Sequence, residues 1–373
     1  MKICFVAPGI YPCLAEKQPT NRIGGAEMQQ LFIGRGLLER GCSISFVTID
    51  HGQPDQETIN GMTIYKTFRE EDGLPAIRFL HPRITTIWRA LKRAGADVYY
   101  CRAAGFIPAV LTTFCACYGK RFVFAGASDT DFLPGQELIR FSRDRHLYRY
   151  GLRRASAVIV QSEYQRDLLR RNYGLDGEVI RNCYQGEAKS LPPEKRQVIL
   201  WVSTIRRLKR PLLFIELAKA FPEERFVMIG GPYGREQELY EEIAKGCAAL
   251  PNMEFLGFQP FAQTEQYFDR CRLFVNTSEI EGFPNTFLQS WRRGLPVISY
   301  VDPDGIINKF GLGRTVTNAE EMKLALKRVL SSSDVDGEGI VSYVRKNHSE
   351  NVFHQYINLF ERLASRTEQG ECF

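Results

Sequence analysis

Short apolar runs alternate with amphipathic segments along most of the chain. The first run, Ile3-Cys4-Phe5-Val6-Ala7, stops at the turn residues Pro8-Gly9. Runs of this kind are typical of buried strands in a parallel sheet. In the first half of the chain they predict strands at residues 3–7, 43–48, 97–101, 121–125, 157–160 and 179–180.

The segments between these runs carry apolar residues at helical spacing. The first has Met28, Leu31, Phe32 and Leu38 on one face and ends at Gly41, which is typical of a helix C-terminus. Further helices are predicted at residues 84–91, 107–117, 140–154 and 163–171. Repeated strand–helix alternation predicts a doubly wound α/β domain over residues 1–186.

The same alternation restarts after a polar, proline-bearing stretch at residues 187–196, which we interpret as an interdomain linker. A second α/β domain is predicted from residue 197 onward. Two similar α/β halves in one chain make a cleft between them the expected ligand site. In the second half of the chain, strands are predicted at 198–202, 226–229, 253–257, 272–276 and 296–300. Helices are predicted at 211–220, 236–247, 263–270, 319–330 and 352–364, and a further helix is predicted to start at 284.

Composition narrows the choice of function without fixing it. A length of 373 residues suits two domains, and the net charge of +6 suits anionic ligands or an anionic membrane surface equally. Nucleic-acid binding is not expected, because no concentrated basic stripe with interleaved aromatic residues stands out. No run approaches the ~18 apolar residues of a membrane span, and no signal peptide is visible. We therefore expect a cytoplasmic protein, with peripheral contact at the inner face of a membrane left open.

The ten cysteines are scattered, and no Cys-x-x-Cys pair occurs among them. Paired spacing is what a zinc site needs, so we expect free thiols in a reducing compartment instead.

Two further segments leave alternatives open. Residues 140–154 carry six arginines and are predicted to form a basic helix, in which Phe141, Tyr148 and Leu152 are apolar. That helix is either a solvated face or a surface for an acceptor or an anionic lipid. The Asp129-Thr130-Asp131 segment matches a metal–nucleotide pattern, but Ser128 or Asp129 can equally act as a helix N-cap.

The most informative stretch is residues 278–289, which follow the predicted strand at 272–276. It places Glu281 in a loop and then starts a helix at Pro284-Asn285-Thr286. A helix N-terminus offers free N–H groups and the positive end of its dipole, so it suits a phosphate. On this helix Asn285 and Gln289 share one face, while Phe287 and Trp291 are expected to face the core.

A cluster of cations follows the predicted strand at 198–202. In parallel sheets, sites form at the carboxyl ends of strands, so this cluster is expected near the 278–289 stretch. Together they predict a diphosphate site that needs no metal. The alternatives are a solvated turn for the cations and a capping or surface role for Glu281. The cations are Arg206, Arg207, Lys209 and Arg210.

In the first half of the chain, Gly24-Gly25 either allows a phosphate to approach the main chain closely or forms only a tight turn.

Several of these segments, taken in order, resemble the family-4 retaining glycosyltransferases. That family has the GT-B architecture, in which two Rossmann-like domains face each other across a cleft. The resemblance covers nearly the whole chain. It is carried by residues 201–211 (WVSTIRRLKRP), 255–258 (FLGF), 281–286 (EGFPNT), 294–297 (GLPV), 24–27 (GGAE) and 37–41 (LLERG).

The resemblance implies a role for each matching position. Glu281 is expected to bind hydroxyls of the transferred sugar, and Arg206 and Lys209 to neutralise the leaving diphosphate. No cofactor is implied, because the nucleotide-diphospho-sugar is a substrate. The resemblance also implies that the first domain binds the acceptor and that residues 197–345 form the nucleotide-sugar-binding domain. Residues 346–373 are expected to form a helix that returns to the first domain. The remaining implied contacts are the main chain of Phe283, Pro284, Asn285 and Thr286 with the distal phosphate, Gly257 and Phe258 with the base, and Gly24 and Gly25 over the phosphates.

Three departures from the family pattern bear on activity. Gln289 stands where the family has a second glutamate, so a ribose contact is kept without its charge. Ser203-Thr204 replaces the usual Gly-Arg. The histidine frequently found after the fourth strand is missing, which makes Asp129 the candidate for orienting the acceptor hydroxyl.

The resulting expectation is a metal-independent, retaining glycosyltransferase of polysaccharide, lipopolysaccharide or glycolipid assembly, acting on a glycan or lipid-linked acceptor. The alternatives are a non-catalytic nucleotide-sugar-binding subunit and a GT-B-type nucleotide-sugar epimerase.

Overall fold

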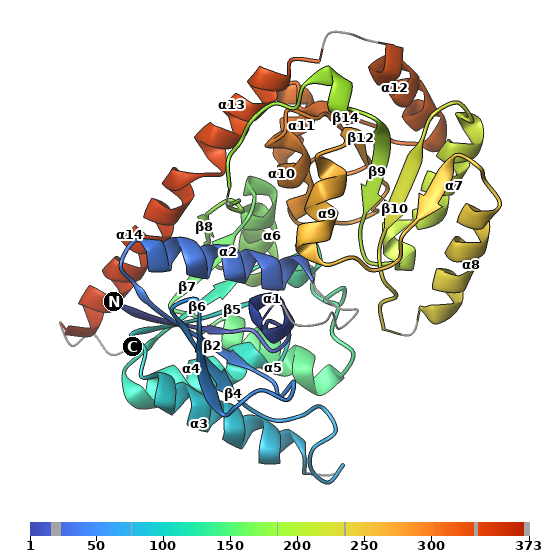
Figure 1. Ribbon diagram of the computed structural model, residues 1–373. Coiled ribbons are helices and arrows are strands. Elements are labelled where there is room, and N and C mark those ends of the chain that lie inside the picture. The colour runs from blue at the N-terminus through green and yellow to red at the C-terminus, as the bar shows by residue number, and fades with distance from the viewer. Residues whose placement is uncertain (16–23, 76, 185, 235, 332–334, 369–373) are drawn as a thin grey trace. The chain divides into compact units, whose positions relative to one another are not determined.

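The computed structural model describes residues 1–15, 24–75, 77–184, 186–234, 236–331 and 335–368 (Figure 1). The chain forms two compact units. The first comprises the described parts of residues 1–183 together with the C-terminal segment from Glu350, and the second runs from Tyr184 to Ser349. The predicted linker at 187–196 therefore lies inside the second unit. Its main chain is bound there, because Lys189 N–H donates to Arg292 O over 2.7 Å and Leu191 N–H to Arg293 O over 2.9 Å.

The first unit is built on a sheet in the order β3-β4-β2-β1-β5-β6-β7-β8. All neighbouring strands pair in parallel except β3 and β4, and central β1 registers Cys4 with Ser45 on one side and with Tyr99 on the other. The strands are β1 (Lys2–Val6), β2 (Ser43–Thr48), β3 (Gln56–Ile59), β4 (Met62–Lys66), β5 (Val98–Arg102), β6 (Arg121–Ala125), β7 (Ala157–Val160) and β8 (Glu178–Val179).

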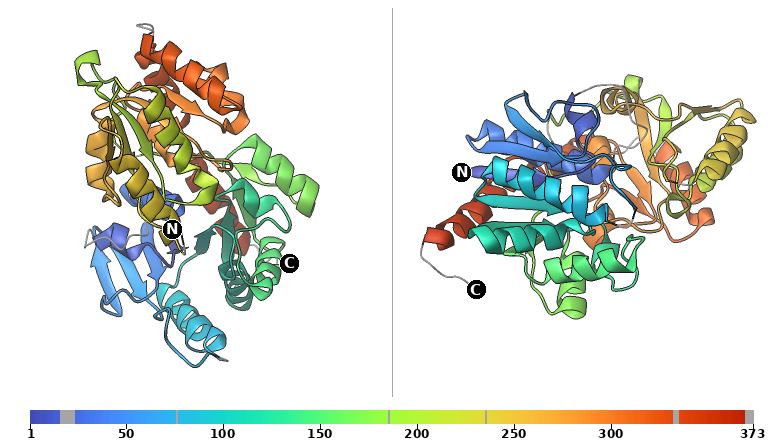
Figure 2. Two further views of the ribbon diagram at one scale, coloured as in Figure 1. Left: turned by 90° about the vertical axis from the view of Figure 1, so that its right-hand side faces the viewer. Right: turned by 90° about the horizontal axis from the view of Figure 1, so that it is seen from below.

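Helices cover both faces of this sheet (Figures 1 and 2). Successive residues of a strand point to opposite faces, so they pack against different helices. Tyr99 packs on Phe114 of α4, whereas the next residue, Tyr100, lies 6.4 Å from the ring centroids of Tyr356 and Phe360 in α14. The helices of this unit are α1 (Tyr11–Ala15), α2 (Gly25–Glu39), α3 (Thr85–Ala94), α4 (Ile107–Tyr118), α5 (Ser142–Leu152), α6 (Glu163–Tyr173) and α14 (Glu350–Glu368).

Two buried side chains hold the last residues of the first unit. The Gln29 amide, on α2, donates to Cys183 O over 2.8 Å and accepts from Cys183 N–H over 3.1 Å. The Arg102 guanidinium, at the end of β5, donates to Asn182 Oδ1 over 2.7 Å. The segment that leaves the first unit is thus fixed on both α2 and β5.

The second unit has an all-parallel sheet in the order β11-β10-β9-β12-β13-β14. Its strands are β9 (Val198–Val202), β10 (Phe226–Ile229), β11 (Met253–Phe255), β12 (Cys271–Asn276), β13 (Val297–Ser299) and β14 (Gly313–Thr315). Its helices are α7 (Pro211–Ala220), α8 (Gln237–Ala248), α9 (Phe261–Phe268), α10 (Asn285–Trp291), α11 (Ile306–Lys309), α12 (Ala319–Ser331) and α13 (Gly337–Asn347).

The prediction for residues 140–154 was partly wrong. Helix α5 begins only at Ser142, so Phe141 is its N-cap and not part of it, and this residue is 52% exposed. Its arginines are not all solvated either, because Arg149 and Arg145 lie 2.8 Å and 3.5 Å from the buried carboxylate of Glu137.

The described cysteines are free, and most are buried. Burial raises the pKa of Cys4 to about 12, so this thiol stays protonated and acts as a small apolar core residue. No helix among the described residues is both long and apolar enough to cross a membrane.

Candidate functional site

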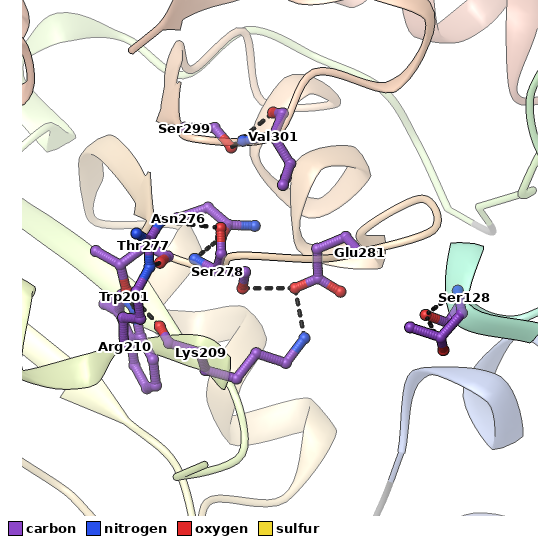
Figure 3. A network of polar contacts seen from close by, with 11 residues as sticks. Ser128, Trp201, Lys209, Arg210, Asn276, Thr277, Ser278, Glu281, Ser299 and Val301 are labelled. Carbon is purple, nitrogen blue, oxygen red and sulfur yellow. Dashed lines mark hydrogen bonds and ion pairs between the residues drawn. The ribbon is translucent and has the colours of Figure 1, made fainter. Parts of the chain in front are cut away.

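The loops that follow the adjacent strands β9 and β12 are joined by hydrogen bonds at the carboxyl edge of the second sheet (Figure 3). The Trp201 indole donates to Thr277 Oγ1 over 2.9 Å, and the Thr277 hydroxyl donates to Lys209 O over 2.6 Å. Arg210 Nε adds a bond of 2.8 Å to Thr277 O. The predicted cation cluster and the 278–289 stretch therefore meet, as their positions after two strands indicated.

Glu281 is the centre of this arrangement (Figure 3). Its Oε1 accepts from Lys209 Nζ over 2.5 Å and from Ser278 Oγ over 2.6 Å. The side chains of Lys209 and Glu281 are only 14% and 17% exposed, so the ion pair is weakly screened by solvent. The second oxygen, Oε2, accepts no hydrogen bond from the described residues. The carboxylate is thus held through one oxygen and can offer the other to a ligand.

The three other predicted cations differ in their surroundings. The Arg206 guanidinium lies 4.3 Å from the ring centroid of Tyr233, and none of the described carboxylates pairs with it. Arg207 is 78% exposed and lies 3.8 Å from Glu236, so the solvated-turn interpretation fits it. Arg210 bonds the β12 loop and lies over Tyr300. Of the four predicted cations, Arg206 and Lys209 are therefore left as the candidates for binding an anionic ligand.

Helix α10 begins at Asn285, with Pro284 as its N-cap. Phe287 and Trp291 are fully buried, which confirms their predicted core positions, and Phe283 packs against Trp291 with ring centroids 6.2 Å apart. The role predicted for Phe283–Thr286 is one of their main chain. That these amides hold a phosphate stays a prediction.

Gln289 lies in a cluster that sequence reasoning missed. It is 5% exposed, and its Nε2 donates to Glu265 Oε1, on α9, over 2.7 Å. The other Glu265 oxygen lies 2.7 Å from Arg292 and 3.1 Å from Arg293, and it accepts from the Tyr184 hydroxyl over 2.6 Å. Because the amide N–H₂ faces Glu265, the Gln289 carbonyl oxygen is the end that is left for another donor.

Gly257 and Phe258 follow β11. Gly257 has φ +63°, and its carbonyl accepts from Gly230 N–H over 2.8 Å. A Cβ at this position would lie 2.8 Å from the Tyr240 hydroxyl, so both the positive φ and the close approach favour glycine. The half-buried ring of Phe258 stands next to this turn. Their predicted contact with a base is untested.

In the first unit, Ser128 is the N-cap of the 3-10 turn at Asp129–Phe132, as one of the open alternatives had it. Asp131 is buried and accepts from the main-chain amides of Ala127 and Ser128 over 2.7 Å and 3.1 Å. The Asp131 carboxylate thus completes the capping box of this turn. Asp129 is half-buried and accepts from Gln165 Nε2 over 2.9 Å, which fixes the carboxylate predicted to orient an acceptor.

Gly24 and Gly25 start α2, where Glu27 brings a carboxylate close to the main chain. A Cβ on Gly24 would lie 2.4 Å from Glu27 Oε2, so a side chain there would displace the carboxylate. Burial raises the pKa of Glu27, although N–H groups of Glu27 and Gly24 act against the rise. The Glu27 carboxyl group thus lies against the helix start at which a phosphate was predicted. The choice between a phosphate contact and a tight turn at Gly24-Gly25 stays a prediction.

Replacing Glu27 with Gln is expected to flatten the pH dependence of stability. Because the folded-state pKa is raised, the wild-type carboxyl contributes stability below its unfolded pKa, and this contribution is lost as pH rises through the folded pKa. The melting temperature of Glu27→Gln should therefore rise relative to wild type between acidic and mildly alkaline pH. Glu39→Gln, an exposed change in the same helix, should show no such trend. Parallel curves for Glu27→Gln and wild type would contradict the assignment.

Comparison with known proteins places the chain in a family. The family model described as Glycosyltransferase Family 4 matches residues 23–186, and the one described as Glycosyl transferases group 1 matches residues 186–346. A comparison with curated proteins gives no match.

Solved structures agree on the fold. Sucrose-phosphate synthase from Thermosynechococcus elongatus is 16% identical, with 98% of this chain and 99% of that chain covered and a TM-score of 0.78. A variant of TarM from S. aureus, in complex with fondaparinux, alpha-GlcNAc-glycerol and UDP, is 12% identical over 96% of this chain and 99% of that chain, with a TM-score of 0.74. The lipopolysaccharide outer core galactosyltransferase WaaB, in apo form, is 18% identical over 97% and 100%, with a TM-score of 0.63.

Two Rossmann-like units, each with a mostly parallel sheet, define the class as the two-domain GT-B fold. With both family models matched in order, the chain belongs to the GT-B glycosyltransferases of family 4 and group 1. The predicted fold and family are confirmed.

Proposed function

We propose that the protein is a retaining glycosyltransferase that moves a hexosyl group from a nucleotide-diphospho-sugar to a hydroxyl of a glycan or lipid-linked acceptor, without a metal. The observation that carries this proposal is the Glu281 carboxylate, which is fixed through Oε1 by Lys209 and Ser278 and leaves Oε2 for a sugar hydroxyl. Two of the similar structures support these classes of donor and acceptor by analogy alone. TarM is in complex with UDP, and WaaB is described as a lipopolysaccharide outer core galactosyltransferase.

Retention can proceed without a protein base. The bond between the sugar C1 and the diphosphate oxygen breaks, with its electron pair leaving on the diphosphate. The acceptor oxygen attacks C1 on the same face, and its proton passes to the departing phosphate oxygen. Lys209 and Arg206 would stabilise the charge on the diphosphate, and Glu281 would stabilise the cationic sugar ring. This route asks for electrostatic groups, which the site has, rather than for a histidine.

The other predicted contacts complete the proposal. The Phe283–Thr286 main chain would hold the distal phosphate, and the Gln289 carbonyl would accept a ribose hydroxyl. Gly257 and Phe258 would lie beside the base. In the first unit Asp129 would orient the acceptor hydroxyl, and the start of α2 at Gly24-Gly25 would face the phosphates.

A panel of nucleotide sugars tests the proposal. One donor is expected to raise the melting temperature by mass action, to be hydrolysed slowly, and to keep its anomeric configuration in the NMR spectrum of the product. The rate should not fall in excess EDTA. Binding without turnover over a broad acceptor panel would favour the non-catalytic subunit. Conversion of the bound donor into its epimer would favour the epimerase.

A further inference from the structure

Arg206 is a cation of the candidate site that makes neither an ion pair nor a side-chain hydrogen bond with the other described residues. Its neighbours along the loop differ from it in this respect. Lys209 pairs with Glu281 over 2.5 Å. Arg210 donates from Nε to Thr277 O over 2.8 Å. Positive charge and N–H donors are therefore both available on Arg206 for an anionic ligand.

The contact that Arg206 does make is with an aromatic ring. Its guanidinium lies 4.3 Å from the ring centroid of Tyr233. The ring quadrupole attracts and orients the cation, but it neither neutralises the charge nor takes up the N–H donors. A carboxylate in the same place would do both, and it would then compete with an anionic ligand. Tyr233 thus holds Arg206 in place and leaves its N–H groups for a ligand.

The main chain fixes the tyrosine relative to the arginine. Arg206 follows β9 and Tyr233 follows β10, and these two strands are neighbours in the sheet. The loops stay joined beyond the strand ends, because Ile205 N–H donates to Gly231 O over 2.9 Å. This hydrogen bond lies next to Arg206 in one loop and two residues before Tyr233 in the other. Both side chains therefore start from main chain that is already ordered.

The ring of Tyr233 has little part in the core of the second unit. Tyr233 is 42% exposed, so much of its ring stays in water. An aromatic side chain stabilises a fold mainly through the area that it buries, and the free energy of unfolding therefore depends little on this residue. Its contact with Arg206 is better explained by the ligand of that arginine than by folding.

We propose that Tyr233 is a positioning residue for the donor, whose ring holds the Arg206 guanidinium where it meets the diphosphate of the nucleotide sugar. The inference rests on the proposed function in one respect, that the ligand of Arg206 is a diphosphate. With Ser203-Thr204 in place of the Gly-Arg of the family pattern, Arg206 supplies the cation from a later position in the loop. Tyr233 supports it there and acts on the ligand only through it.

Pyrophosphate binding by the full chain tests this role, with no sugar or acceptor present. Inorganic pyrophosphate has the two linked phosphates of the donor, and its dissociation constant is measured by isothermal titration calorimetry. Tyr233→Leu should weaken binding by about tenfold, the scale of a cation–π contact. Tyr233→Phe keeps the ring and should bind within about twofold of wild type. Arg206→Ala should weaken binding by about thirtyfold.

A double-mutant cycle separates positioning from a general loss of structure. Because Tyr233 acts through Arg206, adding Tyr233→Leu to Arg206→Ala should weaken pyrophosphate binding by no more than about twofold further. The melting temperature of Tyr233→Leu should stay within about 2 °C of wild type.

Tyr150 of the first unit provides the matched control. It is also 42% exposed, and the Arg154 guanidinium lies 4.2 Å from its ring centroid. Tyr150→Leu therefore removes the same kind of contact from a residue outside the donor site. It should bind pyrophosphate within about twofold of wild type.

Several results would overturn the proposal. They are wild-type binding by Tyr233→Leu, an equal loss in Tyr233→Phe, an undiminished effect of Tyr233→Leu beside Arg206→Ala, and failure of wild type to bind pyrophosphate. Sugar transfer is measured separately. Pyrophosphate binding that depends on Tyr233 and Arg206, without turnover of any nucleotide sugar, would contradict the proposed function and support the positioning role. Transfer by Tyr233→Leu at the wild-type kcat/KM would do the reverse.

Discussion

Replacing Glu281 with Ala should lower kcat/KM for sugar transfer by about a thousandfold, the usual cost of removing one electrostatic group that acts on the transition state. In the proposed reaction, positive charge would develop on the sugar ring as the diphosphate leaves, and the fixed Glu281 carboxylate would be the negative group that stabilises it. Its position needs no rearrangement, because Lys209 and Ser278 already hold Oε1. Most of the loss should therefore appear in kcat rather than in KM.

Two variants make this result specific. Glu279→Ala removes an exposed glutamate two residues away and should keep activity within about twofold. Glu281→Gln keeps the shape but not the charge, and it should lose nearly as much activity as Glu281→Ala. If both Glu281 variants fold and still turn the donor over at the wild-type rate, Glu281 has no catalytic role.

Converting Gln289 into the glutamate of the family pattern should destabilise the second unit rather than improve the enzyme. In wild type the Gln289 amide donates to Glu265 over 2.7 Å. A glutamate there would instead place a second carboxylate against Glu265 in a site that is largely buried, and one hydrogen bond would be replaced by repulsion. We expect a loss of about 2 kcal/mol, or a melting temperature lower by about 4–8 °C for a unit of this size.

A second substitution should reverse that loss. Gln289→Glu/Glu265→Gln restores one carboxylate and one amide, so it should recover at least half of the lost stability in a double-mutant cycle. The penalty of Gln289→Glu alone should shrink at acidic pH, because a protonated carboxyl again donates a hydrogen bond. Gln266→Glu adds the same charge on the exposed side of α9 and should be nearly neutral. An additive cycle would mean that residues 265 and 289 do not interact as described.

The sequence predicted the strands well, because a buried parallel strand is an uninterrupted apolar run that needs no knowledge of its partners. The β3–β4 hairpin was missed for the opposite reason, since its outer strand is polar and half-exposed. A local signal was available there. Asn60-Gly61, with φ of 49° and 79°, forms the kind of two-residue turn that joins antiparallel strands.

Part of the site could be predicted because topology alone brings it together. Lys209 and Glu281 follow neighbouring strands of one parallel sheet, so their proximity follows from strand order. Glu265 was missed because its contact with Gln289 depends on how α9 and α10 pack against each other, which no local pattern encodes. Phe141 was misplaced because a helical pattern shows that a residue is apolar but not where the helix begins.

The hydrogen bond between Gln289 and Glu265 also limits how this lineage can diverge. Codons for glutamine and glutamate differ at a single base, so mutation can reach either residue at both positions in one step. A change of Gln289 to glutamate alone nevertheless leaves two carboxylates in contact. A change of Glu265 to glutamine alone leaves two amides and removes the carboxylate that pairs with Arg292 and Arg293. Relatives with glutamate at the position of Gln289 should therefore carry a neutral residue at the position of Glu265. What selection would preserve is one negative charge in this cluster, while the helix that carries it is free to change.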